Sequence, residues 1–185
     1  MNELEQLAVA DERMDKREQI IDQLMNEYSD GILHLVYTYV KNRTTAEDLT
    51  QEIFIKCYEK LGKFNQQASI KTWVYRIASN HCKDYLRSWH YRKITLNEKM
   101  INYLPSQSKH VEEEVIMKSE ENNLASAVMA LPIKYREVVF LHYYEELSVT
   151  EISKVTIVNV NTIKTRLKRA KELLKDQMTR RFNNE

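Results

Sequence analysis

Apolar side chains recur at steps of three and four residues along most of this chain, a spacing that predicts helices. The first helix is expected at about 16–29, and Asp30-Gly31 is expected to break or bend it. A strongly apolar helical stretch follows at 32–40. Residues 1–15 are either a frayed acidic lead-in or the first turns of a longer helix. The side chains expected to be buried on the first helix are Ile20, Ile21 and Leu24.

The next helix has clearer boundaries. Thr44 and Glu47 have the spacing of a capping box, and Gly62 suits a C-terminal stop. Between them, one apolar stripe consists of Ala46, Leu49, Ile53, Cys57 and Leu61. The pattern therefore predicts a helix with one face packed on a core.

A second face of this helix is acidic and carries one apolar residue. Its members are Asp48, Gln51, Glu52, Ile55 and Glu59. A solvated surface with one stray apolar side chain would show the same pattern, which is common. A docking surface for a basic partner helix would show it too, and spacing alone does not separate the two interpretations.

A helix at about 69–89 has a narrow basic stripe opposite a packed face. At 100° per residue the stripe residues lie close to one line, and they are Arg76, Asn80, Lys83 and Arg87. The opposite face gathers Ile70, Val74, Ile77, Ala78, His81 and Tyr85. Trp73 borders the stripe, and it either packs in the core or stacks on a base. Cations beside an aromatic ring favour binding of an unpaired nucleic-acid strand.

Residues 94–123 change character, with Pro105, two serines and then an acidic run, which indicates a linker leading into a helix. Further helices are expected at 124–131 and at 133–145, with Pro132 in the first turn of the second. Val138, Val139 and Leu141 are expected to be buried there.

Residues 147–174 have the pattern of a helix-turn-helix. Ser148 and Glu151 form a capping box for a short helix that buries Ile152 and Val155. After a break of about five residues, Asn159 caps a second helix. The apolar stripe of that helix is Val160, Ile163, Leu167, Ala170 and Leu174.

The remaining faces of the second helix are polar and cationic. They carry Asn161, Thr162, Lys164, Thr165, Arg166, Lys168, Arg169 and Lys171. From 159 to 181 there are eight Lys/Arg against two acids, a net charge of +6. Charge alone would also fit a solvated basic helix. The capping box and the short preceding helix favour DNA binding, because short polar groups reach base edges while cations hold phosphates.

Composition and motifs favour a helical protein whose cysteines are reduced and which is not an enzyme. Two Gly and two Pro in 185 residues leave few turns, and the net charge of +1 hides an acidic N-terminal segment and two basic segments. Cys57 and Cys82 form no CxxC pair and are expected to be packed thiols, with no metal and no cofactor. No apolar run is long enough for a membrane span and no signal segment opens the chain, so a cytoplasmic location is expected. No catalytic motif is present, and no small-molecule substrate is expected.

Four blocks, in this order and spacing, resemble the extracytoplasmic-function sigma factors of bacterial RNA polymerase. They are AEDLTQEIFIKCYEKLGKF at 46–64, IKTWVYRIASNHCKDYLR at 70–87, LPIKYREVVFLHYYEELSVTEIS at 131–153 and NTIKTRLKRAKELL at 161–174. The resemblance covers about 20–178. It implies an all-α fold of two helical domains, sigma-2-like and sigma-4-like, joined by a flexible linker. The implied division is a lead-in at 1–19, the first domain at 20–93, the linker at 94–123 and the second domain at 124–180.

The resemblance also implies partners and roles. Asp48, Gln51 and Glu52, with Ile55, would dock on core RNA polymerase. The stripe with Trp73 would open and recognise promoter DNA near −10, and the helix-turn-helix would recognise the −35 element. An anti-sigma protein, frequently membrane-bound in this family, is a further expected partner. The rival hypothesis is a free-standing helix-turn-helix repressor or activator, which needs neither the acidic face nor the stripe.

Three positions depart from the family pattern. Asn161 occupies a place where Gly is frequent, and Thr156-Ile157 replaces a Leu-Gly-like pair in the turn. A turn with a β-branched residue and no Gly is expected to avoid positive φ. Asn161 would add an amide able to contact a base.

Overall fold

The computed structural model describes residues 14–88 and 120–182, and these residues form helices and short connections without strands. The elements are α2 (Met14–Val40), α3 (Arg43–Lys60), the 3-10 turn η1 (Leu61–Lys63), α4 (Ile70–Arg87), α6 (Glu120–Ala130), α7 (Ile133–Val139), the π-helical turn η2 (Phe140–Tyr144), α8 (Val149–Thr156) and α9 (Val160–Phe182). The all-α fold of two helical domains is therefore confirmed. Most of the expected lead-in and linker lies outside the described residues.

The helix α2 continues through Asp30 and Gly31, so the alternative of a break there is wrong. A Cβ built on Gly31 would lie 2.1 Å from the Tyr75 hydroxyl and 2.7 Å from Glu145 Oε1. The glycine therefore serves close approach by neighbouring elements, and its φ is not positive. Ile20, Ile21 and Leu24 are buried as expected, whereas the second half buries Ile32, Leu35, Val36 and Tyr39 and leaves Tyr37 exposed.

The boundaries of α3 differ from the expected ones. Asn42 is the N-cap, and its side chain accepts a hydrogen bond from the Thr45 N–H at 2.8 Å, so the expected Thr44–Glu47 capping box is wrong. The helix passes at Leu61 into η1, which contains Gly62 without positive φ, so Gly62 is not a left-handed stop. The predicted apolar stripe is buried throughout.

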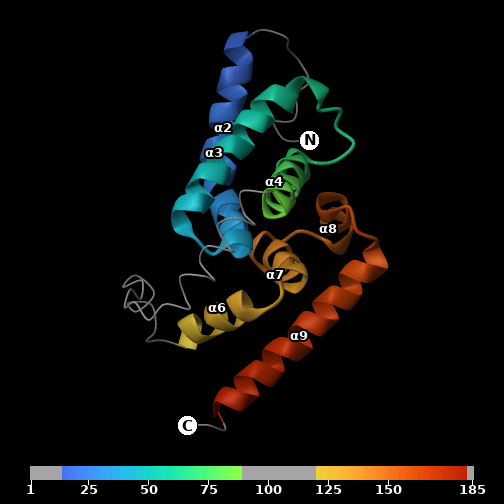
Figure 1. Cartoon of the computed structure of the whole chain (residues 1–185). Coiled ribbons are helices and arrows are strands. Elements are labelled where there is room, and N and C mark those ends of the chain that lie inside the picture. Colours follow the sequence, from blue (N-terminus) through green and yellow to red (C-terminus); the bar gives the residue numbers. More distant parts are fainter. Residues whose placement is uncertain (1–13, 89–119, 183–185) are drawn as a thin grey trace.

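The helix α4 starts after the N-cap Ser69, close to its predicted start, and packs against α2, α3 and α8. Because partners surround it, burial extends beyond the predicted face to include Thr72, Tyr75, Ser79 and Cys82. Figure 1 shows α4 in the middle of the molecule, with α8 beside it and the long α9 running along one edge.

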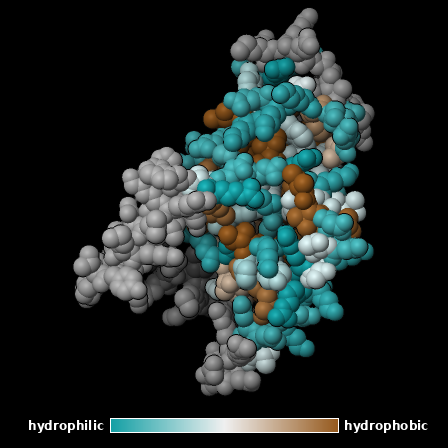
Figure 2. All heavy atoms as spheres, turned by 45° about the vertical axis from the view of Figure 1, so that its right-hand side comes forward, coloured by the Kyte–Doolittle hydropathy of each residue, from teal (hydrophilic) through white to brown (hydrophobic). Residues whose placement is uncertain are grey.

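The second domain consists of the short elements α6, α7, η2 and α8 and the long helix α9. Pro132 is the N-cap of α7, and the backbone continues beyond Val139 as the π-helical turn η2. Val138, Val139 and Leu141 are buried as predicted. One apolar cluster runs through both domains, from Ile20 on α2 to Leu167 on α9. A small separate cluster under α6 contains Val128, Leu131, Val139 and Ala170. Hydrophilic side chains cover most of the face in Figure 2, and hydrophobic ones gather there in small separate groups.

Candidate nucleic-acid and protein interfaces

The helix-turn-helix begins with the predicted capping box. Ser148 N–H donates to Glu151 Oε2 at 2.9 Å, and Glu151 N–H donates to Ser148 Oγ at 3.2 Å. The Ser148 hydroxyl also donates to this carboxylate, and that bond lowers the pKa of Glu151. Ile152 and Val155 are buried beneath α8, as predicted. This fixed start orients the short helix that precedes the turn.

The turn between the helices is shorter and more strained than predicted. It spans only 157–159, and Ile157 has φ 57° and ψ 43°, so the expectation that a β-branched residue avoids positive φ is wrong here. Its neighbours hold the conformation. The Val158 N–H donates to the Ser153 carbonyl at 3.2 Å, and the Ser153 hydroxyl donates to the Val158 carbonyl at 2.6 Å. The Ile157 side chain is 62% exposed, so packing does not offset the strain.

The helix α9 presents polar groups outward from a packed stripe. Asn159 Oδ1 accepts from the Asn161 N–H at 2.8 Å, which places the cap where it was predicted. Ile163, Leu167 and Ala170 are buried, while Val160 and Leu174 are only half-buried. The exposed members of the predicted DNA-contact set are Asn161, Thr162, Lys164, Thr165, Lys168 and Arg169. Arg166 alone of that set is half-buried.

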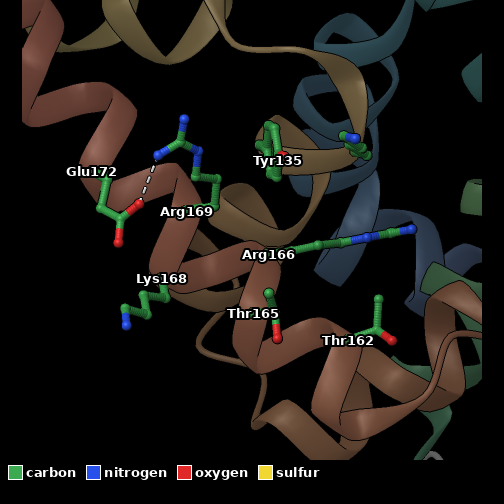
Figure 3. A pocket seen from close by; sticks show the side chains of 8 residues that line it. Tyr135, Thr162, Thr165, Arg166, Lys168, Arg169 and Glu172 are labelled. Atoms are coloured by element: carbon green, nitrogen blue, oxygen red, sulfur yellow. Dashed lines mark hydrogen bonds and ion pairs between the residues drawn. The ribbon is translucent and has the colours of Figure 1, made fainter.

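The side chains of α9 diverge around the helix. Figure 3 shows Arg166 and Lys168 extending to opposite sides. Thr162, Arg166 and Arg169 line an open hollow with Lys134 and Tyr135 of α7. Arg169 Nη1 donates to Glu172 Oε2 at 2.8 Å, and the Thr165 hydroxyl donates to the Asn161 carbonyl at 2.9 Å. These two groups have internal partners that a DNA contact would have to replace.

The acidic face of α3 is accessible. Asp48, Gln51, Glu52 and Ile55 are all exposed, and Ile55 reaches 59%. Glu52 is the exposed end of a short chain of polar contacts, the His81 relay, which consists of Lys56, His81 and Glu52. Lys56 Nζ donates to His81 Nδ1 at 2.8 Å, and His81 Nε2 lies 2.8 Å from Glu52 Oε2.

The relay fixes the form of the imidazole. Because an ammonium can only donate, Nδ1 accepts and the Nε2–H donates to Glu52, which describes a neutral ring. Burial and then the Lys56 charge lower the pKa of His81, in agreement with this form. His81 is therefore buried, as expected for a packed histidine, but it also links α4 to the exposed face of α3.

The basic stripe of α4 is divided by the second domain. Arg76 and Arg87 are exposed and Asn80 is half-buried. Lys83, in contrast, contacts Glu137 of α7 at 3.0 Å and donates to the Thr156 carbonyl of α8 at 3.3 Å. Trp73 is half-buried against Phe64, with ring centroids 5.4 Å apart. In this arrangement Lys83 has protein partners where the sequence suggested a free cation.

Sequence reasoning missed the buried acid Glu137, and a carboxylate in the apolar stretch of α7 was the available signal. The sequence predicted correctly that the two thiols are packed. Cys57 and Cys82 are buried and form no disulfide, and burial raises the pKa of each to about 12. Residues 14–88 and 120–182 contain no group of three potential metal ligands. Over the same ranges, every helix is too short or too polar to cross a membrane.

Known proteins resemble the chain over both halves. The profile for Sigma-70 region 2 matches residues 24–91, and that for Sigma-70, region 4 matches 121–174. The ECF RNA polymerase sigma factor SigW of Bacillus subtilis (strain 168) is 32% identical, over 84% of this chain and 87% of SigW. The sigma factor SigV of the same organism is 31% identical, over 84% and 89%. A sigma factor RpoE from Bartonella quintana, solved with the anti-sigma factor NepR, superposes with a TM-score of 0.65 at 19% identity, over 85% of this chain and 96% of that one.

Proposed function

Because this chain belongs to the ECF sigma factors of RNA polymerase, which direct promoter-specific transcription, we propose that α3, α4 and α9 contact the polymerase, the −10 element and the −35 element respectively. The observation that carries the proposal is the exposed surface of α9, where the Asn161 amide lies near the start of the helix and cationic side chains follow. The short helix α8, with its capping box, precedes this surface. This surface has the geometry of a helix that enters the major groove. The two domains are proposed to divide as the sequence suggests, at 20–93 and 124–180.

The proposed polymerase-docking surface consists of Asp48, Gln51, Glu52 and Ile55. Its exposed acids suit a basic partner helix, since complementary charge speeds encounter and fixes register. Ile55 adds one exposed apolar side chain to this acidic surface, which a partner helix would cover. The His81 relay holds Glu52 in place on this surface.

The proposed −10 surface consists of Trp73, Arg76, Asn80, Lys83 and Arg87. Cations hold the backbone of an unpaired strand without selecting its sequence. Asn80 carries both a donor and an acceptor, which suits recognition of the edge of an extruded base. Trp73 is proposed to place its ring at the edge of that surface for stacking on a base, and Phe64 packs against part of the same ring.

The proposed −35 surface divides into two kinds of contact. Asn161, Thr162, Thr165 and Arg166 would contact base edges, because they lie at or near the start of α9. Lys164, Lys168 and Arg169 would hold phosphates and fix the position of the helix on the duplex. The separation of Arg166 and Lys168 around α9 supports this division.

The protein is further proposed to act in the cytoplasm as an initiation factor without catalytic activity of its own. An anti-sigma protein is a proposed partner, and the Bartonella quintana relative is a sigma factor solved with one. The rival function, a free-standing repressor or activator, lacks support from the exposed α3 face.

The test of the proposed function is a pull-down with bacterial core RNA polymerase, followed by run-off transcription from promoters selected with the reconstituted holoenzyme. We expect co-purification and initiation at a defined start site. DNA binding without polymerase recruitment would favour the rival function instead.

A further inference from the structure

Glu137 of α7 is a charged residue buried between the two domains, with 2% of its surface exposed. The hydroxyls of Tyr39 on α2 and Ser79 on α4 donate to its Oε1, the second at 2.6 Å. Lys83 Nζ on α4 lies 3.0 Å from the same oxygen and also donates to Ser79 Oγ at 2.9 Å. Residues of the first domain therefore neutralise and solvate a carboxylate of the second.

A second acid, Glu145, makes a parallel set of contacts at the seam between the two domains. Lys71 Nζ donates to the Glu145 carbonyl at 2.7 Å and lies 3.3 Å from its carboxylate. The Tyr75 hydroxyl donates to the same carboxylate, and burial raises the pKa of Tyr75. Both sets join α4 to the segment that begins at α7.

Gly31 of α2 makes room for the second set. A methyl group there would lie 2.1 Å from the Tyr75 hydroxyl and 2.7 Å from Glu145 Oε1. Contacts this short are not tolerated, and Tyr75 is fully buried, so it has little space to move. The helix itself does not need a glycine, because α2 is regular on both sides of it.

These contacts oppose the proposed promoter contacts. Lys83, a proposed −10 residue, is held by Glu137 and by the Thr156 carbonyl at the end of α8. Elements centred at −10 and −35 are separated by about 25 base pairs, or roughly 85 Å of B-DNA at about 3.4 Å per step. The packed α4 and α8 lie side by side, so a chain closed in this way cannot span both elements.

We propose that the Glu137 and Glu145 contacts form an interdomain clasp that keeps the free chain closed and withholds Lys83 until the domains separate. The inference rests on the proposed function of α4 and α9. Apolar packing also continues across this seam. Its ionic and hydroxyl groups regain water when the domains part, which lowers the cost of reversible opening. Partners that hold the two domains apart would therefore select the open chain.

The two glycines of the chain provide a matched pair of variants. Gly31→Ala introduces the clash at the seam while favouring the helical conformation of α2. Gly62→Ala is the control, because its added methyl would meet only the flexible end of Arg17, 2.9 Å away within the first domain. Glu137→Ala is an independent opening variant that removes the shared acceptor. Circular dichroism verifies that each variant keeps its helices.

Opening is measured as the distance between spin labels on Glu59→Cys of α3 and Lys175→Cys of α9, both exposed sites. The buried native thiols react slowly, which directs labelling to the introduced ones. We expect one narrow distance distribution for the free chain and for Gly62→Ala. Gly31→Ala and Glu137→Ala should give longer and broader distributions.

The consequence for Lys83 is measured with a fluorescent thymidine dodecamer as a single-strand probe. If the open chain is about one hundredth of the population, too little to broaden the distribution of the free chain, opening should tighten binding by up to about a hundredfold. A broad distribution in the unmodified chain, or a narrow one in both opening variants, overturns the clasp. Opening without tighter binding overturns the withholding of Lys83. Run-off transcription by the unmodified chain separately decides the proposed function.

Discussion

The imidazole of His81 on α4 and the carboxylate of Glu52 on α3 lie 2.8 Å apart, joining a buried helix to an exposed acidic face. Lys56 completes the relay at the other ring nitrogen. A group proposed to bind the polymerase is thus positioned by a residue of the helix proposed to bind DNA. This relationship underlies the pH prediction below.

Reversing charge on the α3 face should abolish polymerase binding. Asp48→Arg combined with Glu52→Arg replaces attraction to a basic partner by repulsion. Both sites are exposed, and circular dichroism checks that loss of the Glu52 contact to His81 leaves the helices in place. The measurement is co-purification with core enzyme. Asp22→Arg with Glu27→Arg on the exposed side of α2 makes the same charge change and should bind normally. Retention of the first double variant at full yield would refute the docking surface.

Stability should fall as pH decreases below about 6.5, the ordinary pKa of histidine. Burial and Lys56 lower the pKa of His81 in the folded chain, so the unfolded chain takes up the proton first. Unfolding is then favoured by acid, and the loss continues until pH passes the lowered folded pKa. Urea unfolding between pH 7.5 and 5 would show a shallower dependence for His81→Gln. An equal slope in both proteins would exclude His81 as the cause.

Asn80→Ala should impair promoter opening while leaving polymerase and −35 binding near normal. The amide is proposed to recognise an extruded base, and flipping that base costs a few kcal/mol that such contacts offset. Permanganate footprinting of unpaired thymines on a cognate promoter gives the measurement. A pre-melted bubble should rescue the variant only partly, since the base is open but not recognised. Opening at the normal rate with normal sequence preference would remove Asn80 from this role.

Two substitutions on α9 should have different effects on sequence preference. Arg166→Ala is expected to lose discrimination at one position, by about 1–3 kcal/mol, whereas Lys168→Ala should weaken binding to all sequences alike. Binding-site selection with both variants distinguishes the outcomes. Identical preference profiles for the two variants and the unmodified protein would abolish the division into base and phosphate contacts.

Ile157→Gly should stabilise the protein. A left-handed conformation costs an ordinary residue roughly 1–2 kcal/mol, and the greater freedom of unfolded glycine offsets part of the gain. A rise of up to about 1 kcal/mol in the free energy of unfolding is expected from urea titration. Ile157→Ala keeps a Cβ and should gain less. Destabilisation by Ile157→Gly would mean that the exposed side chain makes a contact worth more than the strain.

Local signals predicted the parts of the fold that depend on neighbours in sequence. The Ser148–Glu151 capping box, the Asn159 cap and the buried stripe of α3 all follow from spacing over a few residues, and the structure contains each of them. The prediction of the α3 cap was wrong, because both Asn42 and Thr44 are residue types that cap helices and the structure uses Asn42.

Features that depend on distant residues were beyond this reasoning. Gly31 suggested a break because its real cause, the approach of Tyr75 and Glu145, lies in other helices. The partners of Glu137 include Tyr39, which is 98 positions away. For the same reason the spacing predicted the stripe along α4 but could not predict that Lys83 pairs with Glu137 of the second domain.

The continuous apolar cluster has a consequence for folding cooperativity. Because side chains from Ile20 to Leu167 share one core, neither domain of the closed chain can lose its packing without exposing apolar surface of the other. The closed chain is therefore expected to melt as one unit, although its sequence is divided into two modules. A destabilising substitution in the second domain would then also lower the stability of the first domain, before any promoter is bound.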